Sequence, residues 1–175
     1  MATGIGSVPF LEVEATCREI NRLFPHMPFW PQFVKRSYLE DMSVQYSEGL
    51  PLLAVNQEKR TLAVSQSGKR ELELVSFYER FLSEDIEAFA ISEAYAPGLY
   101  TLMASLDEVK SGQAVYIKGQ TVGPITFTSG ILGLDGRPVI HDPELSEALV
   151  RGLAIKALWQ VRVLEKSGRR PVIFL

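Results

Sequence analysis

The sequence has very little of what metal and redox chemistry needs, with one cysteine and two histidines in 175 residues. The single cysteine, Cys17, excludes an internal disulfide, and His26 and His141 add too few ligands for a transition-metal site. No apolar run approaches the roughly 18 residues of a membrane span, and no secretory signal opens the chain. We therefore expect a cytoplasmic protein with no membrane partner.

Positive charge is also scarce. The chain has 18 lysines and arginines against 21 acidic residues, which gives a net charge of −3. Because no positive field is available to hold a phosphate backbone, nucleic acid is not an expected partner. A hydrophobic content of 46% and a charged content of 22% are typical of a globular domain, and no linker, repeat or low-complexity tract interrupts residues 1–175. We expect one domain.

Strand and helix patterns alternate along this domain. Residues 2–7 predict a strand with a glycine turn, and residues 27–33, rich in aromatics and bounded by prolines, predict a second one. A third strand is predicted at 114–118, and the continuous apolar run at 171–175 predicts a fourth. That apolar end without a polar tail predicts that the chain is a piece of a larger protein.

Helices are predicted between these strands, so the strands are expected to be parallel. A helical pattern opens after Pro9, and another at residues 71–83 has an apolar face wide enough to need burial on two sides. Pro97 opens a further helix. Asp142 is predicted to cap the longest helix, which ends at Gly168.

Two excursions from the core are expected. Residues 50–66 predict a surface hairpin, with strands at 52–55 and 61–65. Residues 126–141 predict a loop excursion with a tight turn at Asp135-Gly136.

Polar residues at the ends of the predicted strands, or just after them, are the candidate ligand contacts. In parallel α/β folds the carboxyl ends of the strands carry the chemistry, which favours Gln32, Gln120 and Thr121 as substrate-binding residues. The alternative is that they belong to loops whose polar groups are hydrogen-bonded within the protein. Glu93 follows an apolar stretch and either projects into a cleft or begins a helix. The turn Ile5-Gly6-Ser7 could hold a carboxylate or phosphate, although structural turn glycines are the commoner case.

Five blocks of the chain carry a resemblance: ATGIGSVP at 2–9, PFWPQ at 28–32, KGQTVGPIT at 118–126, the stretch 142–160 and PVIFL at 171–175. Taken in order, they resemble the amino-terminal half of the catalytic domain of cobalamin-independent methionine synthase, with uroporphyrinogen decarboxylase a more distant relative. The resemblance implies a TIM (β/α)8 barrel, of which this chain would be a partial barrel holding about the first four of eight strands.

The resemblance implies a methyltransferase that transfers a methyl group to a thiol such as that of homocysteine, activated on zinc. It gives Ile5, Gly6 and Ser7 a substrate-binding role, while Val122 stands where the family often has threonine. The family's zinc ligands and acidic motif come from the carboxyl half, so this chain is expected to hold no catalytic residue, metal ligand or cofactor of its own. We expect it to be inactive alone.

Two other functions stay open. A protein similar to uroporphyrinogen decarboxylase would need no metal and would bind a macrocycle with several carboxylates, for which Lys35 and Arg36 are the available cations. A non-catalytic module would instead pair with another chain, or with a second copy, through exposed strand edges.

Overall fold

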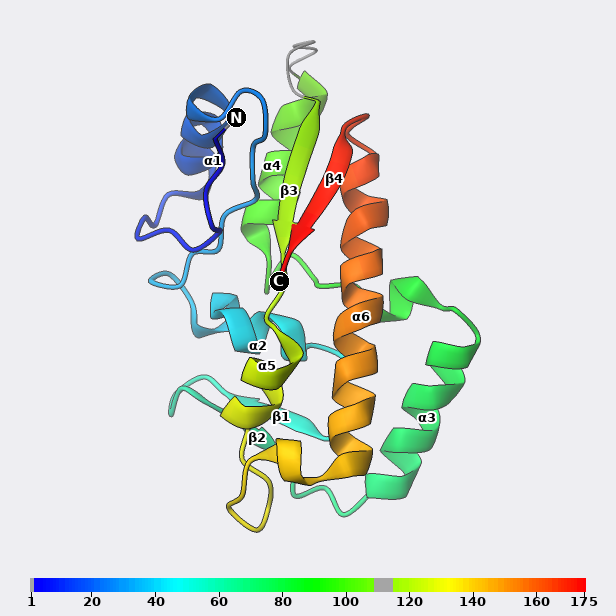
Figure 1. Ribbon diagram of the computed structural model, residues 1–175. Coiled ribbons are helices and arrows are strands. Elements are labelled where there is room, and N and C mark those ends of the chain that lie inside the picture. The colour runs from blue at the N-terminus through cyan, green and yellow to red at the C-terminus, as the bar shows by residue number, and fades with distance from the viewer. Residues whose placement is uncertain (1, 109–114) are drawn as a thin grey trace.

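The computed structural model describes residues 2–108 and 115–175, and Figure 1 shows their arrangement. Helices and strands are both present along the chain, which makes this an α/β protein, but they do not alternate regularly as the sequence predicts. In order, the elements are α1 (Val13–Leu23), η1 (Tyr38–Glu40), α2 (Met42–Ser47), β1 (Leu53–Asn56), β2 (Thr61–Val64), α3 (Arg70–Leu82), η2 (Ile86–Phe89), α4 (Pro97–Glu108), β3 (Tyr116–Gln120), α5 (Pro124–Gly130), η3 (Val139–His141), α6 (Pro143–Glu165) and β4 (Arg170–Phe174).

Parallel pairing of β3 with β4 organises the part of the protein that carries the predicted site. The register aligns Tyr116 with Arg170 and Gln120 with Phe174, so both strands end at the same level. Two single bridges, Phe29 to Lys118 and Ser7 to Gln32, place the amino-terminal segments parallel to β3. The carboxyl ends of these segments therefore face the same side, toward α2 and α5 in Figure 1.

The expectation of a TIM (β/α)8 barrel, with this chain as its first four strands, is wrong. The described residues contain four strands in two separate two-stranded sheets, one antiparallel and one parallel, with no barrel arrangement.

The two amino-terminal segments predicted as strands form only the single bridges. In a regular strand, N–H groups two residues apart point to the same side. Here the N–H of Trp30 donates to the backbone oxygen of Lys118 on β3. The N–H of Gln32 instead donates to the backbone oxygen of Gly6 in the amino-terminal segment. Pro31 stands between these two residues and has no N–H to donate, and the ladder is interrupted there.

The hairpin and the long helix follow their sequence signals. Strands β1 and β2 pair antiparallel, which confirms the hairpin within 50–66. The Asp142 side chain accepts a hydrogen bond from the Leu145 N–H at 3.1 Å, which confirms the predicted N-cap of α6. The excursion at 126–141 differs in part, because Pro124 begins the short helix α5 before the predicted turn at Asp135-Gly136. The third predicted strand starts at residue 114, outside the described residues.

The main core lies where α6 packs against β3, β4 and the aromatic residues of α3 and η2. Phe77 and Trp159 are buried in it. Only one side of α3 is covered, since Leu72, Val75 and Leu82 are exposed. The expected burial of this helix on two sides is therefore wrong for the described chain. None of the helices described has the length and hydrophobicity of a membrane span.

Candidate functional site

A buried lysine lies at the centre of the predicted site. Lys118 is on β3, and its side chain is fully buried. Its Nζ donates to the backbone oxygen of Ile5 and, at 3.2 Å, to Oε1 of Gln120. The ring centroids of Phe174 and Phe29 lie 4.8 Å and 5.9 Å from Nζ. The amino terminus, β3 and β4 thus meet around one ammonium group.

The Lys118 ammonium has polar neighbours but no counter-charge. Within residues 2–108 and 115–175, no carboxylate forms an ion pair with it. Burial lowers the pKa of Lys118 to about 8, because desolvation penalises the charged form. An unpaired buried charge costs several kcal/mol, and groups perturbed in this way are concentrated at functional sites. The arrangement suits an anionic ligand.

Gln120 is held in one orientation beside this ammonium. Its Nε2 donates to the backbone oxygen of Trp30 at 3.1 Å, and its own backbone oxygen accepts the hydroxyl of Tyr46. Gly6 lies against the Gln120 side chain, so that a Cβ at position 6 would be 2.8 Å from Cδ of Gln120. Gly6 also has a φ of +147°, which disfavours other residues. Glycine is therefore required at position 6 by both space and backbone.

Gln32 begins a second polar chain next to Gly6. Its backbone N–H donates to the Gly6 oxygen at 2.9 Å, and its side-chain Nε2 donates to Oε1 of Gln45 at 2.6 Å. The amide of Gln45 in turn donates to the backbone oxygen of Tyr95. Gln32 and Gln45 are both buried. These bonds fix the loop around Tyr95 against the end of the parallel segments.

The structure brings most of the predicted residues together and leaves one outside. Gly6, Gln32 and Gln120 are linked as described, and the Thr121 N–H donates to the Phe174 oxygen at 2.8 Å. The remaining three differ. Ile5 contributes its backbone oxygen while its side chain is exposed, and Ser7 is exposed beside its bridge to Gln32. Glu93 is exposed and makes no hydrogen bond or ion pair with the cluster among the described residues.

Sequence reasoning missed the residues that carry and support the charge. Lys118 interrupts an otherwise apolar strand pattern, a signal that could have identified it. Gln160 of α6 accepts from the Trp30 indole N–H at 3.2 Å and donates to the Tyr46 hydroxyl at 3.3 Å. Because Gln160 occupies a buried position on a long helix, only the fold reveals that it supports the site.

A second buried lysine has a different environment. Lys156 of α6 donates to the backbone oxygen of Phe89 at 3.0 Å. Burial also lowers its pKa to about 8, while the negative charge of Glu48 opposes this shift. Lys156 of α6 bonds to η2 and makes no hydrogen bond to Ile5 or Gln120, so it is a natural comparison for Lys118.

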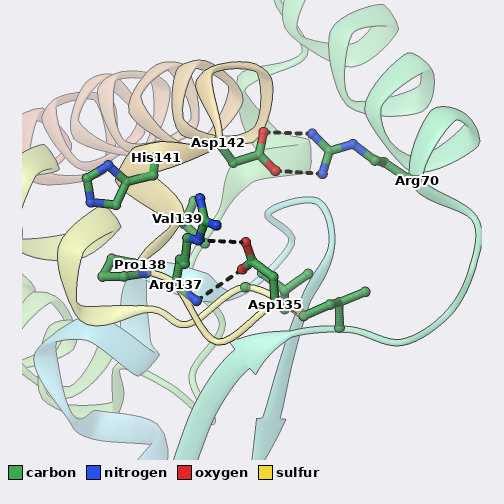
Figure 2. Close-up of a pocket in the computed structure, with 10 residues that line it drawn as sticks. Arg70, Asp135, Arg137, Pro138, Val139, His141 and Asp142 are labelled. Atoms are coloured by element: carbon green, nitrogen blue, oxygen red, sulfur yellow. Dashed lines mark hydrogen bonds and ion pairs between the residues drawn. The ribbon is translucent and has the colours of Figure 1, made fainter.

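A cavity of about 230 Å³ lies at the start of α6. Figure 2 shows its two arginines, Arg70 and Arg137, each paired with a carboxylate. Arg70 donates two hydrogen bonds of 2.8 Å to the Asp142 carboxylate and a further one to Glu144. Arg137 lies 3.6 Å from Asp135. The Arg70 pairs join α3 to the start of α6, and the Arg137 pair lies within the loop before η3, which assigns these residues a structural role.

The described residues do not fit a zinc site. They contain no group of three or more histidine, cysteine, aspartate or glutamate side chains placed to hold a metal ion. Cys17 is buried with its Sγ 3.7 Å from the Gly98 oxygen, and burial raises the pKa of its thiol to about 12. A thiol that stays protonated at neutral pH is a poor metal ligand.

Comparison with known proteins finds no protein-family model, no curated protein and no solved structure that matches the chain.

Proposed function

We propose that this chain is the substrate-binding amino-terminal half of a methyltransferase, similar to methionine synthase, that acts on an amino-acid thiol such as homocysteine. The observation that carries the proposal is the meeting of Gly6 and Gln120 at one buried ammonium. Both belong to blocks on which the resemblance rests, and the bond from Lys118 to Ile5 joins positions 113 residues apart. A cationic, amide-lined site suits the polar end of an amino acid.

The chain's own residues bind and orient in this proposal, and none performs the chemical step. Methyl transfer needs a thiolate, whose sulfur forms the new bond to carbon as the bond from the donor to the methyl group breaks. In the family that the sequence resembles, zinc supplies the thiolate at neutral pH. Because that family's zinc ligands come from the carboxyl half, we assign thiol activation to a carboxyl-terminal half.

Binding of L-homocysteine by Gly6→Ala tests the proposal. The new Cβ displaces the Gln120 side chain, so we expect affinity to fall by about tenfold or more, equivalent to about 1.4 kcal/mol. Gly136→Ala is the matched control, because Gly136 also has positive φ, at +77°, but no atom lies within 4 Å of its would-be Cβ. Isothermal calorimetry with both variants makes the measurement.

Three results would contradict the proposal. The first is absence of homocysteine binding by the unaltered chain, and the second is equal loss in Gly6→Ala and Gly136→Ala. The third is methyl transfer, or stoichiometric tight zinc binding, by these 175 residues without a second polypeptide.

A decarboxylase-like function has less support from the site. Of the two cations available to bind a carboxylate-rich macrocycle, Arg36 is held by Glu40 at 2.8 Å, and Glu40 is fully buried. Of these two exposed cations, that ion pair leaves Lys35 as the one without a carboxylate partner in the described residues. A single surface lysine is a poor basis for recognising several carboxylates.

Self-association is a second candidate that one observation favours. Among the described strands, β4 pairs with β3 alone, and Phe174 and Leu175 at its end are 47% and 87% exposed. An open strand edge with apolar side chains can pair with another copy. Light scattering over a concentration series would detect a dimer that Leu175→Lys weakens, whereas a monomer at every concentration would reject this function.

A further inference from the structure

We infer that Lys118 anchors the carboxylate of a small organic acid, which reaches the ammonium when the Phe174 ring moves aside. The inference deepens the proposed function, on which the identity of that acid as an amino-acid thiol rests. It assigns the recognition of the carboxylate to one buried side chain and makes an aromatic residue of β4 the movable wall of the site.

The hydrogen-bonding capacity of the ammonium leaves room for a ligand. A lysine ammonium has three N–H donors. Two of them donate to neutral acceptors, the Ile5 backbone oxygen and the Gln120 side-chain oxygen. One donor and the whole positive charge are therefore available. A carboxylate would supply the missing acceptor together with the counter-charge.

The two aromatic neighbours differ in their freedom to move. Phe29 is 5% exposed, and its ring packs edge-on against Phe24 at a centroid distance of 5.4 Å. Phe174, closer to the ammonium, is 47% exposed. Rotation of Phe174 toward solvent uncovers Nζ without disturbing the buried core. Entry of the ligand from the β4 side is therefore the less costly route.

The charge of the site selects the ligand class. Lys118 is the one cation that contacts this cluster within the described chain, and its neighbours are amide, backbone and aromatic groups. One positive charge balances a carboxylate, whereas a phosphate dianion would leave a buried negative charge. The exposed side chains of Ile5 and Phe174 provide apolar surface for the rest of a short aliphatic acid.

Four probes separate the carboxylate from the thiol. L-homocysteine has thiol, amine and carboxylate, 4-sulfanylbutanoate lacks the amine, 3-aminopropane-1-thiol lacks the carboxylate, and butanoate has the carboxylate alone. Calorimetric titration of the full chain is compared with Lys118→Met and Lys156→Met. We expect Lys118→Met to lose about tenfold or more in affinity for the three acids. Lys156→Met should keep the affinity of the unaltered chain.

A pH series with butanoate needs no variant and keeps the inference testable if Lys118→Met does not fold. Butanoate itself does not titrate near neutral pH, so the free chain's Lys118, with its pKa lowered to about 8, controls binding. Between about pH 7 and pH 9 the affinity should fall about tenfold as the ammonium loses its proton. Equal affinity at both pH values would overturn the inference.

The remaining outcomes separate the inference from the proposed function. Homocysteine binding that is unchanged in Lys118→Met would overturn the inference and leave the function standing. Butanoate binding as tight as that of 4-sulfanylbutanoate, and dependent on Lys118, would support the inference and remove the support for a thiol substrate. Tight binding of 3-aminopropane-1-thiol in place of the acids would overturn the inference.

Discussion

At the scale of the residue, the site is built around a lysine that lowers the stability of the folded chain. Lys118 is fully buried among neutral groups, and its pKa is lowered to about 8 from 10.5. Between these two pH values the unfolded chain still holds a proton that the folded chain has released. The free energy of unfolding therefore rises with pH across this window, and Lys118 lowers stability below it.

This linkage predicts that Lys118→Met stabilises the protein at neutral pH. We expect the free energy of unfolding to rise by about 1–3 kcal/mol at about pH 7, and this advantage to shrink toward about pH 10. Urea denaturation of both proteins across this range measures the effect. A variant that is much less stable than the unaltered chain at neutral pH would contradict the account of Lys118 as an uncompensated charge.

At the scale of the element, α6 supports the site through a close approach that the sequence does not reveal. Gly152 lies in the middle of this helix, and a Cβ there would be 2.3 Å from Cδ2 of Leu50. The glycine lets α6 pack closely against the segment that leads into β1. Further along the same helix, Gln160 contacts Trp30 and Tyr46.

This packing predicts that Gly152→Ala destabilises the protein, although alanine is the better helix former. Overpacking against Leu50 should cost about 1–3 kcal/mol. Gly130→Ala, at the end of α5 with nothing within 4 Å of the new Cβ, is the control and should leave stability within about 1 kcal/mol of the unaltered chain. Thermal unfolding of the two variants compares them. A stabilised Gly152→Ala would contradict the close approach.

Elements with strong local signals could be predicted from the sequence, and pairings between distant segments could not. Asp142 and Pro143 locate the start of α6 because capping acts within one helical turn. The interrupted ladder around Pro31, in contrast, depends on two separate neighbours, because the N–H of Trp30 bonds to β3 and that of Gln32 bonds to Gly6. A period-two pattern indicates a strand but says nothing about how long its ladder is.

The candidate site shows the same division. Gly6, Gln32 and Gln120 follow predicted strands, and the parallel arrangement of their segments brings them together. Glu93 lacked such a strand and lies on the exposed surface. The charge of Lys118 is visible in the sequence. Lys118 was missed because its burial and the lack of a counter-charge in the described chain are properties of the fold.

At the scale of the whole molecule, the proposed function assigns substrate binding to the cluster around Lys118 and thiol activation to a carboxyl-terminal half. The arginine-lined cavity of Figure 2 is the competing location for a ligand, but Arg70 there holds α3 to the start of α6, and Arg137 is paired with Asp135 of its own loop.

Titration of the isotopically labelled chain with L-homocysteine, followed by amide NMR shifts, tests the central claim most directly, because it locates the ligand without any substitution. The account predicts that the largest shifts occur at Gly6, Gln120 and Phe174, around the buried ammonium. Shifts confined to Arg70 and Asp142, or none at saturating homocysteine, would contradict it.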